Sequence, residues 1–150
     1  MNVNEVMTHN IEWTGPTTTL ADAARRMRDR NIGCLPVGEG DGFIGMLTEK
    51  DFTNRATAAG LDPTTTPVSQ IMTHHVIYCL SGDSVEDALG IMRANKIRHL
   101  PVRDQETKRV VGIVSLTDLA MKAPSELYGD ISKLAFRRTL AVDYAGQRAN

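Results

Sequence analysis

The sequence contains one short motif twice, and this repetition constrains the fold more than any other feature. The segment 45–51 returns as the segment 112–118. In each copy an apolar, glycine-containing run precedes a hydroxyl residue, Thr48 or Ser115, and an aspartate follows three positions later. A hydroxyl residue three positions before an acid is typical of a helix N-terminus. We therefore expect each copy to be a strand leading directly into a helix, whose first amides and dipole favour anions.

The repeat extends well beyond this motif. Residues 6–8 match residues 71–73, and residues 35–37 match residues 100–102, both 65 positions later. The motif itself recurs 67 positions later, so the second copy has a longer hairpin. A register kept over this length indicates a duplication.

Each repeat is predicted to have the order β-α-β-β-α. Helix caps are expected at Thr19 and Ser84, because apolar residues at helical spacing follow each of them. The second helix of the first repeat is expected to end at Gly60, since glycine suits the position after a helix. The predicted strands are 11–13, 35–37 and 43–47 in the first repeat, and 76–79, 100–102 and 110–114 in the second.

These elements predict an α/β (α+β) fold in which two repeats pack with pseudo-twofold symmetry, followed by a C-terminal helix. We divide the chain into repeat one at 1–60, a linker at 61–67, repeat two at 68–123 and a helical tail at 124–150. In the tail Ser125 is the expected cap. An apolar stripe should dock on the flank of the module or, as the favoured alternative, in a subunit interface. The stripe consists of Leu127, Ile131, Leu134 and Ala135, widened by Phe136 and Leu140.

The composition excludes several classes of function. A net charge of −1 argues against non-specific nucleic-acid binding, which needs a basic excess. The chain shows neither a secretory signal at its start nor a run of about 18 apolar residues, so no membrane segment is predicted. Cys34 and Cys79 do not form a Cys-x-x-Cys motif. Free thiols in the cytoplasm are the favoured interpretation, although a disulfide between the two remains an alternative.

Four features together resemble a known family: Val-Ser-Gln-Ile-Met-Thr at 68–73, the capped helix, Arg-His-Leu-Pro-Val at 98–102 and Gly-Ile-Val-Ser at 112–115. The chain resembles a tandem CBS-domain pair, or Bateman module, of the small bacterial hypoxic-response type. This resemblance implies a regulatory module without enzymatic activity or obligatory cofactor. It also implies an adenine nucleotide (AMP, ADP, ATP) or related adenosyl ligand in clefts between the units, a ligand-dependent conformational change, a homodimer and an unknown effector protein.

The resemblance also assigns ligand-binding residues. Thr48 and Ser115 would contact phosphate, and Asp51 and Asp118 would hold the ribose diol. Spacing alone favours all four residues as helix caps, and the two roles can coexist. Basic side chains near phosphate would be Lys50 in the first repeat and Arg98 with His99 in the second, the alternatives being solvated surface and strand edge. Adenine would lie against residues that are otherwise ordinary core strand, namely Ile32, Gly33, Cys34 and Pro36 in the first repeat, and Ile97 and Pro101 in the second.

Other functional interpretations are weaker. The Gly-x-Gly-x-x-Gly pattern at 40–45 precedes a strand instead of a helix, so it does not indicate a dinucleotide fold. His74 and His75 lack further ligands at metal-binding spacing, and no metal site is predicted. A nucleotide-processing enzyme is disfavoured because no nucleophile and base are found together. The remaining alternative is a ligand-free interaction module that acts through its dimer and its tail.

Overall fold

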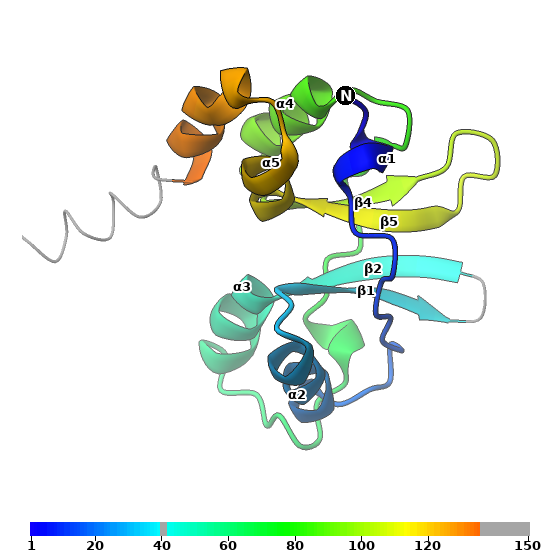
Figure 1. The fold of residues 1–150 in the computed structure, drawn as a ribbon. Helices are drawn as coiled ribbons and strands as arrows, with labels where there is room; N and C mark the ends of the chain where they lie inside the picture. The colour runs from blue at the N-terminus through cyan, green and yellow to red at the C-terminus, as the bar shows by residue number, and fades with distance from the viewer. Residues whose placement is uncertain (40–41, 136–150) are drawn as a thin grey trace, which may run out of the picture. The chain divides into compact units, whose positions relative to one another are not determined.

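The computed structural model describes residues 1–39 and 42–135 and divides into two compact units (Figure 1). The continuous unit is Asn10–Ile77, and the split unit joins Met1–His9 to the chain from Tyr78 onward. In each unit helices cover one face of a small sheet, which confirms the predicted α+β class. No helix in the described part of the chain has the length and apolarity needed to cross a membrane.

The continuous unit is built around an antiparallel hairpin. Its strands pair from Cys34 with Thr48 to Glu39 with Gly42, with an irregularity after Val37. Helices α2 and α3 lie on the same face of this hairpin (Figure 1). The elements are α2 (Leu20–Arg30), β1 (Cys34–Glu39), β2 (Gly42–Thr48), α3 (Glu49–Asp51), the π-helix η1 (Phe52–Thr57) and the 3-10 helix η2 (Val68–Gln70).

The split unit has a three-stranded sheet in the order β3-β4-β5, with a parallel pair followed by an antiparallel pair. Helices α4 and α5 cover one face of β4 and β5 (Figure 1). The elements are α1 (Val3–Val6), β3 (Cys79–Leu80), α4 (Val85–Asn95), β4 (His99–Arg103), β5 (Val110–Ser115), α5 (Leu116–Lys122) and the 3-10 helix η3 (Ser125–Leu127).

The predicted helix caps are confirmed. The hydroxyl of Thr19 accepts a hydrogen bond from the amide of Asp22 at 3.3 Å, and that of Ser84 accepts one from Asp87 at 3.0 Å. Gly60 has the left-handed conformation expected after a helix, with φ of 67°. These local signals therefore placed both long helices correctly.

Three local predictions were wrong in whole or in part. The strand expected at 76–79 is reduced to β3, because only Cys79 and Leu80 pair with β4. Residues 11–13 do not form a strand, because only Thr14 pairs, in an isolated bridge with Val37. Pro16 follows almost at once and has no amide with which to continue a ladder. Ser125 is not a helix cap. Pro124 holds the cap position, and Ser125 already lies inside the 3-10 turn.

Each unit is completed by a short segment from a distant part of the sequence. In the continuous unit Thr73 forms a two-bond bridge with Met46, with N–O distances of 2.8 and 3.0 Å. In the split unit Thr8 forms the same bridge with Ile113, at 2.8 and 3.1 Å. The compact units therefore do not coincide with the sequence repeats. Residues 1–9 complete the unit of the second repeat, and residues 68–77 complete the unit of the first.

A glycine on the neighbouring strand permits this approach. A methyl group added at Gly45 would lie 2.8 Å from the Met72 sulfur and 2.8 Å from the Thr73 carbonyl oxygen. At Gly112 the corresponding distances are 2.5 Å to the Met7 sulfur and 2.9 Å to the Thr8 oxygen. The repeated motif thus contains glycine because the two backbones nearly touch there.

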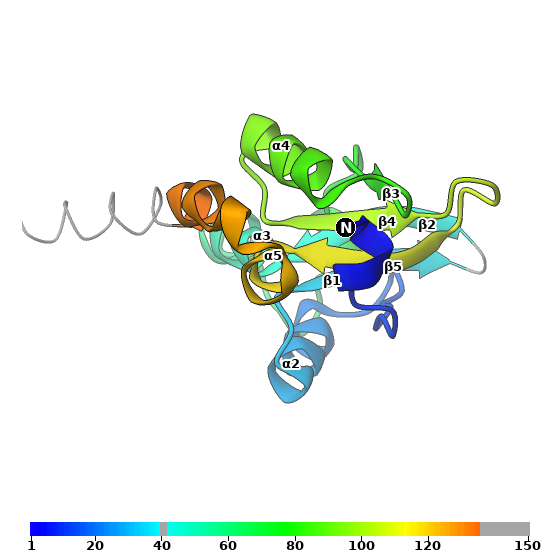
Figure 2. The ribbon, with the colours of Figure 1, turned by 45° about the horizontal axis from the view of Figure 1, so that its top comes forward.

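The C-terminal tail docks on the split unit, which is one of its two expected locations. Residues 128–135 are helical and lie beside α4 and α5 (Figures 1 and 2). Ile131 is buried in the core of this unit, and Asp130 forms an ion pair with Arg93 at 3.3 Å. Phe136 and Leu140 lie outside the described residues. The described part of the apolar stripe therefore serves the fold of its own unit.

We predict that Gly112→Ala lowers the free energy of unfolding by about 1–3 kcal/mol, because the Thr8 carbonyl must move and the bridge to Ile113 must distort. Gly90→Ala is the matched control, since nothing lies within 4 Å of an added methyl in the middle of α4. The control should stabilise by about 0.5–1 kcal/mol. Urea unfolding of both variants tests this, and a Gly112→Ala protein as stable as wild type would contradict it.

Candidate functional site

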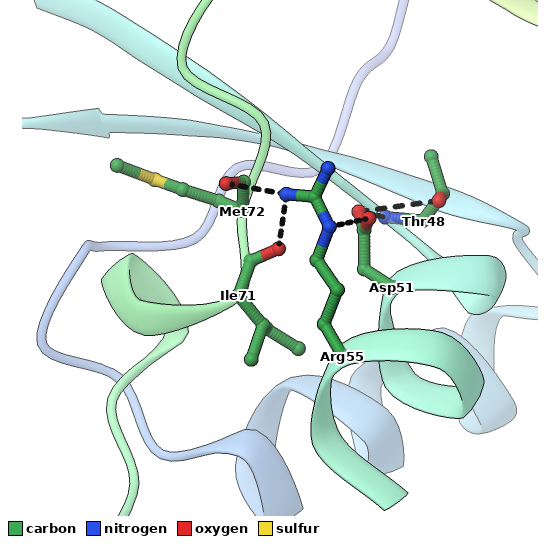
Figure 3. Close-up of polar contacts among 5 residues, drawn as sticks. All are labelled: Thr48, Asp51, Arg55, Ile71 and Met72. Carbon is green, nitrogen blue, oxygen red and sulfur yellow. Dashed lines mark hydrogen bonds and ion pairs between the residues drawn. The ribbon is translucent and has the colours of Figure 1, made fainter. Parts of the chain in front are cut away.

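The repeated hydroxyl and aspartate form a closed hydrogen-bonded turn where β2 ends. The Oδ2 atom of Asp51 accepts hydrogen bonds from the Thr48 amide at 2.9 Å and from the Thr48 hydroxyl at 3.2 Å (Figure 3). Asp51 is only 6% exposed, which is unusual for a carboxylate. The helix-cap interpretation of this pair is therefore confirmed.

The second oxygen of Asp51 faces an arginine that the sequence analysis missed. The Nε atom of Arg55 lies 3.6 Å from Oδ1 of Asp51, and its Nη1 atom donates to the carbonyls of Ile71 and Met72, both at 3.2 Å (Figure 3). The guanidinium thus links the aspartate to the segment that completes the unit. The sequence does contain a signal for this ion pair, since an acid and a base four residues apart on a helix lie on the same face.

The split unit repeats the turn without that arginine. Oδ2 of Asp118 accepts from the Ser115 amide and the Ser115 hydroxyl, both at 2.8 Å. Oδ1 of Asp118 has no partner among the described residues. Lys122 occupies the position equivalent to Arg55, but its Nζ atom donates to the carbonyl of Val6 at 3.0 Å. Half-buried Asp118 therefore keeps one oxygen available.

Capping and ligand binding need different atoms of the same carboxylate. An ionised carboxylate has about four acceptor positions on two oxygens. In both units the cap occupies Oδ2 alone. The Ser115/Asp118 turn can therefore hold its helix start and still offer Oδ1 to hydrogen-bond donors such as the two hydroxyls of a diol, whereas Oδ1 of Asp51 already faces Arg55.

The expectation of free amides at the helix start was wrong for the first residue of each helix. The amide of Glu49 donates to the Gly33 carbonyl at 3.2 Å, and that of Leu116 donates to the Arg98 carbonyl at 2.8 Å. Strand pairing brings these carbonyls over the helix start, because Cys34 lies opposite Thr48. The first amide of each helix is therefore not available to an anion.

The structure brings some predicted site residues together. Gly33 and Cys34 adjoin Thr48, and His99 lies opposite Ser115 with Arg98 beside it. The guanidinium of Arg98, however, donates to the Ala135 carbonyl of the tail at 2.9 Å. Lys50 is exposed on the first helical turn.

The remaining predicted residues lie further from the turns. Pro36 and Pro101 are buried in mid-strand, opposite Met46 and Ile113. Ile32 and Ile97 are partly buried and pack against the two cores. All four have the placement of ordinary core residues. Residues 1–39 and 42–135 contain no group of three His, Cys, Asp or Glu side chains that could hold a metal ion.

Comparisons with known proteins agree with this geometry. A family model described as "CBS domain" matches residues 3–57 and 68–124. The CBS domain-containing protein YhcV of Bacillus subtilis is 39% identical over 124 residues, which are 83% of this chain and 86% of that protein. The relationship therefore extends over both repeats.

Two solved structures are similar in fold. Hypoxic Response Protein I with two coordinated zinc ions is 33% identical with a TM-score of 0.72, and the match covers 83% of this chain and all of that one. The CBS domain pair of protein MJ0100, in complex with 5-methylthioadenosine and S-adenosyl-L-methionine, is 25% identical with a TM-score of 0.72. That match covers 81% of this chain and 98% of that one. The predicted resemblance, including the hypoxic-response type, is confirmed.

Cys79 is a buried thiol close to a carboxylate. The side chain on β3 is 1% exposed. Burial, reinforced by the negative charge of Asp83, raises the pKa of Cys79 to about 12. The thiol therefore stays protonated in the folded protein at pH values where it would ionise in the unfolded chain.

This difference predicts a loss of stability in alkali. The contribution of a raised pKa is complete below the unfolded value, near 9, and is lost as the pH rises towards 12. Between these values wild type should lose about 1.4 kcal/mol per pH unit more than Cys79→Ala. Urea unfolding of both proteins across this range gives the difference. Parallel pH dependences of the two proteins would contradict the prediction.

Proposed function

The chain belongs to the CBS-domain family as a tandem pair of these regulatory domains, and we propose that its regulatory ligand is an adenine nucleotide or a related adenosyl compound. The observation that best supports this proposal is that only one of the two carboxylate oxygens of Asp118 accepts hydrogen bonds from the protein. Its Oδ1 atom has no partner among the described residues, while Oδ2 is fixed by Ser115. A carboxylate fixed in this way suits the vicinal hydroxyls of a ribose, as in dinucleotide-binding folds.

The hydroxyl residues have a second role in this proposal. In the structure the hydroxyls of Thr48 and Ser115 donate to their aspartates. A hydroxyl rotates freely and donates equally well to a phosphate oxygen. The backbone amide of each turn would then keep the carboxylate in place. Lys50, which is exposed, adds a flexible positive charge at the first turn.

The comparison with MJ0100 supports the same ligand class, since that CBS pair is described in complex with two adenosyl compounds. We infer that the ligand acts by population shift, because it stabilises whichever conformation of the pair binds it better. An effector protein or a second copy of the chain would recognise this conformation. A cytoplasmic homodimer without catalytic activity remains our proposal for the acting species.

A ligand-free interaction module is the second candidate. The observation in its favour is an exposed pair of large side chains on the split unit, Met121 at 76% and Tyr128 at 50%. Against it, Ile131 of the tail is buried in the core of its own unit and is not exposed to a partner. The adenosyl proposal explains the repeated turn, whereas the interaction module explains only its capping role.

The first prediction of this proposal concerns thermal stability. A ligand at about one hundred times its dissociation constant adds roughly 2.7 kcal/mol per site. For a chain of this size each kcal/mol raises the melting temperature by roughly 2–4 °C. We therefore expect AMP, ADP, ATP or S-adenosylmethionine to raise it by several degrees. No shift with any adenosyl compound at millimolar concentration would leave the interaction module as the better explanation.

The second prediction separates capping from binding. In Asp118→Asn the amide oxygen can still accept the Ser115 amide, while the NH2 group takes the place of Oδ1 and cannot accept from a diol. The variant should lose one binding event in calorimetry and lose less than about 1 kcal/mol of stability. Asp51→Asn should remove the other event. Wild-type stoichiometry in both variants would show that these aspartates are caps only.

A further inference from the structure

Arg55 and Lys122 occupy equivalent positions, four residues after the two aspartates. Their side chains nevertheless differ in what they contact. Arg55 forms an ion pair with Asp51 at 3.6 Å, whereas Lys122 is directed to the Val6 carbonyl at 3.0 Å. No ion pair joins Lys122 to Asp118 in the described part of the chain. One repeated carboxylate is therefore charge-balanced, and the other is not.

The free donors of Arg55 are also placed to meet an anion. Its side chain is 51% exposed, and its bonds to Asp51, Ile71 and Met72 use only Nε and Nη1. The Nη2 group has no partner among the described residues (Figure 3). A guanidinium fixed on one side with two donors free on the other suits a phosphate oxygen.

No guanidinium is paired with Asp118 among the described residues. Its helix begins with Leu116 and Thr117, where the first repeat has Glu49 and Lys50. The guanidinium of the nearby Arg98 is bonded to the Ala135 carbonyl of the tail. An uncompensated carboxylate repels phosphate and favours neutral or cationic ligands.

We propose that Arg55 is a specificity-determining residue. It makes the Thr48/Asp51 site selective for phosphorylated adenosyl ligands, while the Ser115/Asp118 site accepts adenosyl ligands without a phosphate. This inference rests on the proposed function. It assigns opposite charge preferences to two turns whose diol-binding groups are the same.

AMP and adenosine, which differ only in the phosphate, are the probes. Two-dimensional NMR titrations report each site through its own amides, Thr48 and Lys50 for one and Ser115 and Thr117 for the other. In wild type AMP should bind the Thr48/Asp51 site more tightly than adenosine. Arg55→Gln should weaken AMP there by about tenfold, with adenosine affected less than about twofold. Arg55→Lys, which keeps the charge but not the fork, should recover part of the AMP affinity.

Lys122→Gln is the matched control, because it removes the same charge from the equivalent position of the other repeat. It should leave AMP affinity at the Thr48/Asp51 site unchanged. Equal losses in Arg55→Gln and Lys122→Gln would overturn the proposal, since only overall charge would then matter. Unchanged AMP affinity in Arg55→Gln, or an equal preference for AMP at both sites, would also overturn it.

Pyrophosphate distinguishes failure of this inference from failure of the proposed function. If neither AMP nor adenosine binds wild type, the adenosyl proposal is lost. Pyrophosphate shifts at Thr48 and Lys50 that disappear in Arg55→Gln would still support Arg55 as the anion-selective group. No pyrophosphate shift in wild type would overturn the inference. Melting curves of every variant establish that the binding differences are measured on folded protein.

Discussion

The close approach of a methionine-threonine segment to a strand glycine holds each unit together. Thr73 bridges Met46 beside Gly45, and Thr8 bridges Ile113 beside Gly112. A side chain on either glycine would collide with a backbone carbonyl, so substitution by a larger residue is unfavourable at these positions. The split unit consequently needs the N-terminal segment, because Thr8 completes its sheet by a bridge to Ile113, more than one hundred residues later. A contact of such long sequence separation carries a large loop-closure entropy, so it depends on this tight packing.

The same packing fixes the two hydroxyl–aspartate turns. The strand that carries the glycine continues directly into the hydroxyl residue and the capped aspartate, at Thr48 and Asp51 or at Ser115 and Asp118. Lys122 donates to the Val6 carbonyl, and Arg55 donates to the carbonyls of the equivalent segment. The segment that completes each sheet is thus also bonded to the helix that carries the aspartate. A movement of this segment would therefore also displace the turn, because these hydrogen bonds connect the two.

The helix caps could be predicted because they depend on local chemistry. That residues 1–9 complete the unit of the second repeat, and residues 68–77 the unit of the first, could not be predicted. Thr19 and Ser84 were recognised as caps because a cap depends on residues within one helical turn. The prediction of a strand at 11–13 was wrong because strand pairing depends on a partner that is distant in sequence. The matched residues 6–8 and 71–73 have nearly the same pattern, so the sequence shows that they are equivalent but not which hairpin each one joins. Arg98 shows the same limit, since a strand-edge arginine carries no sequence signal for its bond to Ala135.

The difference between Arg55 and Lys122 follows from the shapes of their side chains. A guanidinium presents five donors in a planar fork, so one arginine can bond two carbonyls and still lie beside a carboxylate. An ammonium is a compact point charge, and in this fold the Val6 carbonyl holds it at 3.0 Å. The wider π-helical turn that begins at Phe52 also occurs only in the repeat with the arginine, within the described chain. The duplication thus preserved the carboxylate turn in both repeats, while the cation four residues later and the winding of its helix diverged.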